Sequence, residues 1–306
     1  MLSIQEHTPL APLTTFRIGG IARYFAEAYS DSDIRQALAW AHERNVSFVI
    51  VSGGSNVLIN DMGYDGLVIR IQTMDYAFDN GVLRAGAGCN LLTIIRLAAG
   101  RRLGGWEKLA GIPGSVGGAV RGNAGAFGSE IKDFVTTVEA LNTKTLESKT
   151  FLNSQVAFAY RQSFFKTHPE WIILRTSFVL KITDTGESAR LIGDTIAERE
   201  RRHLQDVQAA GSFFMNPVAP REIQEMFEKE KGAPARLGRV PAGWLIEKVG
   251  MKGATVGGAI ASEQHPNYIV NIGNATAADV LELAHRIKEA VSEKFGIELE
   301  EEAVRL

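Results

Sequence analysis

Two glycine-rich segments hold the residues whose types and spacing best suit chemistry. The first, residues 52–56 (SGGSN), follows a short apolar run that starts at Phe48. Successive amide N–H groups in such a turn form a concave anion site, and a serine hydroxyl adds a donor, which suits a diphosphate. Glycine also serves ordinary turns, so this segment alone does not distinguish a binding loop from a structural one. Its candidate binding residues are Gly53, Gly54, Ser55 and Asn56.

The second segment, residues 104–128, contains nine glycines in 25 residues, and Arg121 is the only charged side chain between Leu109 and Gly128. A flexible linker would be richer in serine and charge. Because glycine lacks a Cβ and permits positive φ, main chain pressed against a ligand explains this composition better. The candidate binding residues are Ile112, Pro113, Gly114, Ser115, Gly117, Gly118, Asn123 and Gly125.

The glycine spacing does not match the usual nucleotide-binding signatures. Neither segment has the GxGxxG dinucleotide fingerprint, and no P-loop lysine follows the second. A purely structural loop is the alternative for each segment. Two such loops at separate strand ends favour a dinucleotide held from two sides by backbone N–H groups.

Composition and charge exclude several classes of protein. The 306 residues are 45% hydrophobic and 22% charged, which predicts two or three globular domains. A net charge of −2 gives no field that would attract nucleic acid or an anionic membrane. The single cysteine, Cys89, excludes a disulfide framework and a cysteine-based metal site, so we expect no metal and a small packed thiol. No signal-like or membrane-spanning run is found, so we expect a cytoplasmic protein without membrane insertion.

Hydrophobic periodicity predicts a mixed α+β chain. The clearest helix begins at Thr276, where Thr276 and Asp279 form a capping-box pattern. Other helices are expected at 30–44, 90–101, 187–204, 222–231 and 242–249, and strands at 48–52, from 82, at 135–142, at 171–182, and near 254 and 268.

Seven ordered motifs give the chain a specific resemblance. They are residues 14–20 (TTFRIGG), the two glycine segments, 160–163 (YRQS), 211–217 (GSFFMNP), 242–258 and 271–274. Over nearly its whole length the chain resembles the UDP-N-acetylenolpyruvoylglucosamine reductase family. The resemblance implies an FAD-binding region of the vanillyl-alcohol-oxidase (PCMH) type with two α/β lobes, 1–78 and 79–200. A C-terminal α+β substrate-binding domain, 201–306, would follow, with its last strand returning to the flavin site.

The same resemblance implies the reaction. FAD, reduced by NADPH, would reduce the enolpyruvyl ether of UDP-N-acetylglucosamine to UDP-N-acetylmuramate for peptidoglycan synthesis. Neither glycine segment contains a histidine or cysteine that could carry a covalent flavin link, so we expect non-covalent FAD. We expect a monomer whose partners are the nucleotide sugar and NADPH.

Two side chains match the family's catalytic arginine and proton donor. Hydride addition leaves negative charge on the substrate, so a fixed cation is needed, and Arg161 matches it. An isolated arginine would otherwise be assigned to a surface salt bridge. Ser212 matches the family's proton donor, and its alternative is a helix cap or turn residue.

The third catalytic group of the family is a C-terminal carboxylate, which Glu302 matches best. The family commonly has LEPEVR there, whereas this chain has Ala303 before Val304, so Glu301 stays an alternative. An acidic run can also be a solvated tail.

Substrate contacts are assigned by position to Asn216, Lys248 and His265. A lone histidine is more often packed or at the surface. The chain departs from the family's pattern at Met215, where lysine is common, at the pair Arg121 and Gly122, and at Phe127. The short stretch 163–171 has no room for the tyrosine-bearing insertion of the longer subclass, so the short subclass is implied.

Two rival functions remain open on sequence grounds. A flavin-dependent oxidase of the same superfamily would share the glycine loops but would not need Ser212 to protonate a carbanion. A non-catalytic flavin- or nucleotide-sugar-binding regulator would need none of the three catalytic groups.

Overall fold

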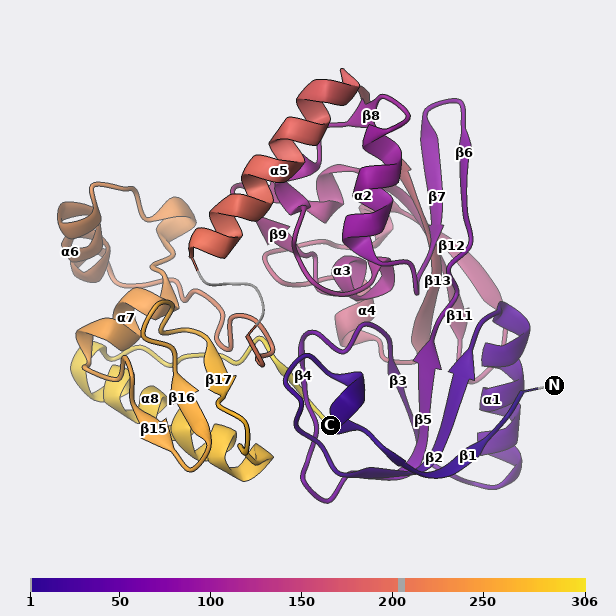
Figure 1. Cartoon of the computed structure of the whole chain (residues 1–306), viewed down its shortest axis with the longest axis horizontal. Helices are drawn as coiled ribbons and strands as arrows, with labels where there is room; N and C mark the ends of the chain where they lie inside the picture. The colour runs from indigo at the N-terminus through magenta and orange to yellow at the C-terminus, as the bar shows by residue number, and fades with distance from the viewer. Residues whose placement is uncertain (1, 203–206) are drawn as a thin grey trace. The chain divides into compact units, whose positions relative to one another are not determined.

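The computed structural model describes residues 2–202 and 207–306 and separates into two compact units (Figure 1). The first unit comprises Met1–Thr8, Ala22–Gly54 and Tyr64–Arg201. The second comprises Pro9–Ile21, Ser55–Gly63 and Arg202–Leu306. The division at 78 and 200 predicted from the sequence stays a prediction.

A four-stranded sheet and one helix open the first unit. Its strand order is β1 (Gln5–Pro9), β2 (Ile21–Ala28), β5 (Tyr64–Ile71) and β3 (Phe48–Val51), and β5 pairs in parallel with both β2 and β3. Helix α1 (Asp31–Glu43) buries Ile34 and Leu38, as its 3.6-residue spacing predicts. Ser30 caps this helix by accepting a hydrogen bond from the Asp33 amide.

A five-stranded antiparallel sheet forms the rest of the first unit, with short helices around it. Its order is β12 (Ser148–Leu152), β11 (Val135–Asn142), β13 (Trp171–Val179), β7 (Val82–Gly86) and β6 (Tyr76–Asp79). The helices are α2 (Leu91–Ala99), α3 (Val116–Arg121), α4 (Phe164–Thr167) and α5 (Thr185–Arg201). Two-stranded pairs join β8 (Leu103–Gly104) to β14 (Lys181–Ile182) and β9 (Gly125–Ala126) to β10 (Ser129–Glu130); 3-10 helices lie at Glu107–Leu109, Ile131–Asp133 and Asn153–Gln155. The expected helix end at 203–204 lies outside the described residues.

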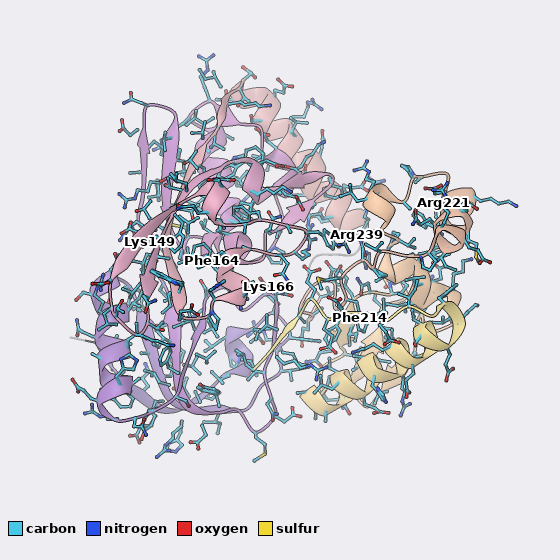
Figure 2. The ribbon with its side chains drawn as sticks, turned by 180° about the vertical axis from the view of Figure 1, so that it is seen from behind. Lys149, Phe164, Lys166, Phe214, Arg221 and Arg239 are labelled. Atoms are coloured by element: carbon cyan, nitrogen blue, oxygen red, sulfur yellow. The ribbon has the colours of Figure 1, made fainter. Side chains whose placement is uncertain are left out.

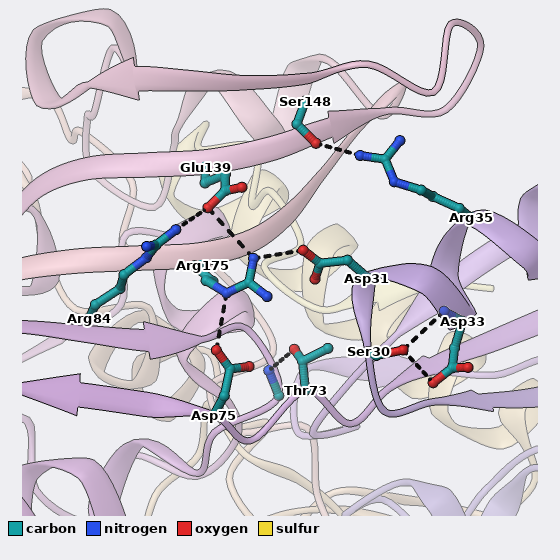
Figure 3. A network of polar contacts seen from close by, with 11 residues as sticks. Ser30, Asp31, Asp33, Arg35, Thr73, Asp75, Arg84, Glu139, Ser148 and Arg175 are labelled. Carbon is teal, nitrogen blue, oxygen red and sulfur yellow. Dashed lines mark hydrogen bonds and ion pairs between the residues drawn. The ribbon is translucent and has the colours of Figure 1, made fainter.

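Arg175 links helix α1 to the five-stranded sheet (Figure 3). Its guanidinium contacts Asp31 at 2.7 Å, Asp75 at 3.0 Å and Glu139 at 3.6 Å. The hydrogen bond with Asp31, helped by the bond and charge of Asp75, raises the pKa of Arg175 despite its partial burial. In the first unit, the half-buried charge of Arg175 is therefore balanced by three nearby carboxylates.

The second unit packs three helices and a small sheet around its own core. The helices are α6 (Arg221–Lys231), α7 (Ala242–Lys248) and α8 (Ala277–Phe295); the antiparallel sheet is β15 (Thr255–Val256), β16 (Ala259–Ala261) and β17 (Ile269–Asn271); and 3-10 helices lie at Ala11–Leu13 and Arg236–Gly238. Phe214, labelled in Figure 2, is one of the largest buried side chains of this core. The capping box predicted at Thr276 and Asp279 is confirmed.

Two N-terminal segments fold into the second unit. The parallel strand β4 (Val57–Leu58) pairs with the C-terminal strand β18 (Val304–Arg305). The carboxylate of Asp61 accepts hydrogen bonds from the amides of Ala277 and Ala278, at 2.7 and 3.1 Å, where α8 begins. In the described residues no helix is long and apolar enough to cross a membrane, and no group of three or more His, Cys, Asp or Glu could hold a metal ion.

Candidate functional site

The two glycine segments touch in the first unit. A Cβ built on Gly53 would lie 2.7 Å from the Cα of Gly114 and 2.9 Å from the amide nitrogen of Ser115. Gly54, Gly111 and Gly114 all have positive φ, between 62° and 110°. Such closeness and such φ values are accessible to glycine and costly for other residues. Converging turns with no acidic side chain in residues 52–56 or 109–128 fit the diphosphate of a dinucleotide.

Some predicted binding residues also build the loop itself. The Ser115 hydroxyl accepts a hydrogen bond from the Gly118 amide at 3.2 Å and so caps α3. A Cβ on Gly117 would lie 2.8 Å from the Cβ of Ala87, so Gly117 lets α3 approach the turn after β7. Local packing and helix capping thus explain why positions 115 and 117 are serine and glycine, without reference to a ligand.

Asn123 fixes the end of the second loop. Its side chain is fully buried, donates to the Ala159 carbonyl at 2.8 Å and accepts from the Lys132 amide at 3.3 Å. Its φ of 44° lies in the left-handed region, which asparagine tolerates better than most residues. Asn123 therefore joins the glycine loop to the segment that carries Arg161.

Arg161 lies at the tip of a tight turn on this loop. Ala159 and Gln162 exchange two backbone hydrogen bonds of 3.1 Å, so Tyr160 and Arg161 occupy the two central positions. Nη2 of Arg161 donates to the Gly125 carbonyl at 3.1 Å, and the guanidinium lies 5.2 Å from the centre of the Tyr160 ring. The structure therefore brings the predicted catalytic arginine onto the predicted cofactor loop.

The neighbours of Arg161 hold the turn in place. Lys166, labelled in Figure 2, donates from Nζ to the Arg161 carbonyl at 3.0 Å. The buried Ser163 hydroxyl donates to the Arg121 carbonyl at 2.7 Å, at the end of α3. The YRQS motif is thus a turn anchored to α3 at one end and to the glycine loop at its tip.

A cavity of about 350 Å³ in the second unit brings together three of the predicted residues. Ser212, Asn216 and His265 line it; the other lining residues are Phe227, Lys231, Pro241, Gly243, Trp244, Glu247, Pro266 and Asn267. The aromatic rings offer an apolar surface, and the lysine, glutamate and histidine offer polar contacts. This mixture is typical of pockets for small polar ligands.

The Ser212 side chain is available to a ligand. Its hydroxyl makes no hydrogen bond within the described part of the chain, and it caps none of the helices described there. The neighbouring backbone is fixed, because the Phe213 amide donates to the Asn267 carbonyl at 2.7 Å. Ser212 is thus a cavity-lining hydroxyl on a rigid segment.

Asn216 and Lys248 each have structural contacts. The Asn216 side-chain oxygen accepts from the Ala242 amide at 3.0 Å, at the first residue of α7. Lys248 is not part of the cavity lining: its Nζ pairs with Glu230 at 2.6 Å. The hydrogen bond with Lys248 lowers the pKa of Glu230. The structure therefore places Asn216 and His265 with Ser212, and Lys248 outside the group.

The C-terminal segment runs beside the Ser212 loop. The Glu302 amide donates to the Phe213 carbonyl at 2.8 Å, and the Glu302 carbonyl accepts from Nδ2 of Asn56 at 3.1 Å. The predicted residues Asn56, Ser212 and Glu302 thus belong to neighbouring segments of the second unit.

The carboxylate of Glu301 is engaged in ion pairs. It forms hydrogen bonds with Arg305 and lies 3.8 Å from Nζ of Lys288, and its side chain is only 13% exposed. The Glu301 carboxylate is therefore paired with cations within the fold.

Comparison with known proteins decides the family. Residues 22–145 match the family model of the FAD binding domain, and residues 202–306 match that of the C-terminal domain of UDP-N-acetylenolpyruvoylglucosamine reductase. Proteins of that name from Solibacter usitatus and Carboxydothermus hydrogenoformans are 38% and 35% identical to this chain, over 98% and 97% of it and 96% and 91% of their own length. The chain belongs to the UDP-N-acetylenolpyruvoylglucosamine reductase family.

The solved structures agree with this membership. The crystal structure of the reductase from Thermus caldophilus matches with a TM-score of 0.78 and 30% identity, covering 100% of this chain and 99% of that one. The predicted α+β fold, with an FAD-binding region followed by a C-terminal domain of this family, is confirmed.

Sequence reasoning missed several cavity residues. Lys231 and Phe227 come from α6, which showed only as an amphipathic helix, and no local signal marks them. Trp244 and Glu247 lie in the 242–258 motif that carried the resemblance, so the motif was the available signal.

Cys89 is packed as expected. It is 4% exposed, and its thiol donates toward the Asp75 carbonyl at 3.4 Å. Burial raises the pKa of the thiol to about 11. Cys89 is therefore a poor nucleophile at neutral pH.

Proposed function

We propose that this chain is an FAD-dependent oxidoreductase that reduces the enolpyruvyl ether of UDP-N-acetylglucosamine to UDP-N-acetylmuramate, with NADPH as hydride donor, in peptidoglycan synthesis. The observation that carries the proposal is the similarity, over 98% of the chain, to a relative named UDP-N-acetylenolpyruvoylglucosamine reductase. The cavity that contains Ser212 supports it, because the reaction needs a proton donor beside a bound nucleotide sugar.

The backbone of residues 53–56 and of the second glycine loop would hold FAD. When bound, FAD supplies the hydride that it receives from NADPH. The peptide N–H groups of the two converging turns would bind the diphosphate, and close glycine packing keeps these turns together. The attachment would be non-covalent, since neither loop carries a histidine or cysteine and the Cys89 thiol is protonated. Yellow colour that stays with the acid-precipitated protein would contradict this.

Ser212 would donate the proton. Hydride addition to the terminal carbon of the enolpyruvyl group leaves negative charge on the carbon that bears the ether oxygen. A hydroxyl without an intramolecular partner can transfer its proton there, provided that the alkoxide left behind is stabilised or reprotonated. The fixed backbone at Phe213 would hold the hydroxyl in one position.

Arg161 would stabilise the charge that develops on the substrate. Its hydrogen bond to Gly125 fixes the guanidinium on the cofactor loop, so no reorganisation is needed when the charge appears. Preorganised cations of this kind contribute more than mobile ones, because a mobile side chain must first be ordered.

Glu302 is the better candidate for the third catalytic carboxylate. The carboxylate of Glu301 pairs with Arg305 and Lys288, which gives it a structural role. Backbone hydrogen bonds tie Glu302 to Phe213 and Asn56. Glu302 would polarise the substrate carboxylate or relay a proton.

Asn216 and His265 would contact the nucleotide sugar in the cavity, and Lys248 would act from outside it. The short stretch 163–171 supports membership of the subclass without the tyrosine-bearing insertion. We further infer a monomeric enzyme of the cytoplasm.

One spectroscopic experiment tests the proposal. Purified protein should be yellow. Its oxidised-flavin absorbance should disappear on anaerobic addition of NADPH and return on addition of the enolpyruvyl nucleotide sugar. Protein that is colourless, or yellow but not bleached by NADPH, would indicate a regulator. Bleaching by a hydroxy acid or sugar alcohol, with no response to the enolpyruvyl compound, would indicate an oxidase.

A further inference from the structure

Arg121 is the only charged side chain between Leu109 and Gly128, and residues 52–56 contain none. It is the last residue of α3, the short helix that begins beside the contact between Gly53 and Gly114. A single arginine in such a neutral stretch needs a reason, since helix α3 and its loop fold through backbone and glycine contacts.

The guanidinium of Arg121 has no partner among the residues that the structure describes. It is half-buried, and within residues 2–202 and 207–306 it makes no hydrogen bond and no ion pair. Burial alone lowers its pKa, because no opposite charge offsets the lost solvation. Leaving a cation in this state costs free energy unless an anion arrives.

Two other half-buried arginines of the same unit form ion pairs. The Arg175 side chain, 20% exposed, has three carboxylates, and that of Arg70, 27% exposed, pairs with Glu27 at 3.1 Å. The contrast indicates that the partner of Arg121 is not part of the described chain.

The position of Arg121 assigns that partner to the cofactor. The match to the FAD binding domain spans residues 22–145, which includes Arg121 and excludes Arg161. The carbonyl of Arg121 is tied to Ser163, so the start of its side chain is fixed to the wall of the predicted cofactor site.

We propose that Arg121 binds an anionic group of FAD and supplies the one full positive charge between Leu109 and Gly128. This inference rests on the proposed function, because it requires that the chain bind FAD. The diphosphate carries two negative charges, and the planar guanidinium can bind phosphate oxygens through two parallel hydrogen bonds. The reduced flavin ring, which can also carry a negative charge, is the other group of FAD that Arg121 could bind.

The test compares Arg121→Met with Arg121→Lys and with a control, Arg96→Met. Methionine keeps the length and removes the charge, whereas lysine keeps the charge. Arg96 is an exposed arginine of α2, outside both glycine segments, so its loss should change neither FAD affinity nor midpoint potential. The dissociation constant of FAD is measured by flavin fluorescence on apoprotein at low and high salt, and the midpoint potential of bound FAD by anaerobic titration.

Arg121→Met should weaken FAD binding about 10- to 100-fold and reduce its salt dependence, with partial recovery in Arg121→Lys. That outcome would identify the diphosphate of FAD as the group that Arg121 binds. Unchanged affinity with a lower midpoint potential assigns the reduced flavin ring, and also supports the proposal. Unchanged affinity and potential overturn it, and a raised KM for the enolpyruvyl substrate would then assign Arg121 to the substrate carboxylate.

The melting temperature separates ligand binding from folding. Removing an unpaired half-buried cation should leave the melting temperature of the apoprotein equal or higher, while the increase produced by FAD becomes smaller. An apoprotein that melts much lower would show a structural role instead and overturn the proposal. If wild-type protein binds no FAD, the proposed function fails as well; if wild type and Arg121→Met have the same FAD affinity and the same midpoint potential, only the inference on Arg121 fails.

Discussion

The backbone of Gly53 rests directly against the backbone of Gly114. A methyl group on Gly53 would lie 2.7 Å from the Cα of Gly114, closer than any real Cβ comes to another heavy atom. Two loops that are about 60 residues apart in the sequence therefore meet as bare main chain. Their contact sets the spacing of the N–H groups available to a diphosphate.

Gly53→Ala should weaken FAD binding at least tenfold and destabilise the protein by roughly 1–3 kcal/mol, because the two turns must move apart to admit the methyl group. Gly193→Ala is the control, since a Cβ there meets nothing within 4 Å and the position lies in α5. That change should stabilise the protein by about 0.5–1 kcal/mol. FAD titration and chemical unfolding measure both effects. Wild-type FAD affinity in Gly53→Ala would show that the loop contact is irrelevant to the cofactor.

Local patterns in the sequence predicted the helices well. Helix α8 was recognisable from its capping box and its apolar face, and α1 from its Ser30 cap, because both signals are encoded within one or two turns. Glycine enrichment likewise marked the loops before their contact was visible.

Long-range contacts could not be predicted from local patterns. Asp61 caps α8 from 216 residues away, and Asn271 donates to the Phe16 carbonyl at 3.1 Å, so two N-terminal segments join the second unit. Whether the Glu301 carboxylate is paired likewise depends on Arg305 and Lys288, which only the fold brings close. The sequence also could not show that Arg121 lacks a partner in the described part of the chain, because that depends on which side chains the fold brings near it.

Ser212→Ala should separate the two half-reactions. Reduction of the flavin by NADPH needs no proton from this hydroxyl, so its rate should stay near wild type. Reoxidation by the enolpyruvyl substrate should slow by about 10² to 10⁴, the usual contribution of a general acid. Stopped-flow absorbance follows each step, and Ser154→Ala, an exposed serine of the first unit, serves as control. Equal slowing of both steps would make Ser212 a structural residue.

Cys89 should resist thiol reagents in the folded protein at neutral pH, because burial holds the pKa of its thiol near 11. Below the ordinary thiol pKa of 9.0 the Cys89 thiol is protonated in both the folded and the unfolded state, and its packing contributes fully to stability. Between about 9 and about 11 only the unfolded state ionises, so stability should fall as pH rises through this range. Chemical unfolding at several pH values measures this, and Cys89→Ala should lose that part of the pH dependence. Rapid labelling of native protein at pH 7 would contradict the prediction.

Glutamine substitutions should distinguish Glu301 from Glu302. Glu301→Gln removes an ion pair with Arg305, and so should lower stability slightly, by up to about 1 kcal/mol, with near-normal catalysis. Arg305→Gln should reproduce that stability loss, and the double variant should lose little more, since both changes break the same pair.

Glu302→Gln removes an ionisable proton with little change of volume. It should leave FAD bound and flavin reduction by NADPH intact, while substrate reduction falls at least 100-fold. A severe loss in Glu301→Gln with near-normal Glu302→Gln would reverse the assignment, and mild effects in both would place the third catalytic group elsewhere in the chain.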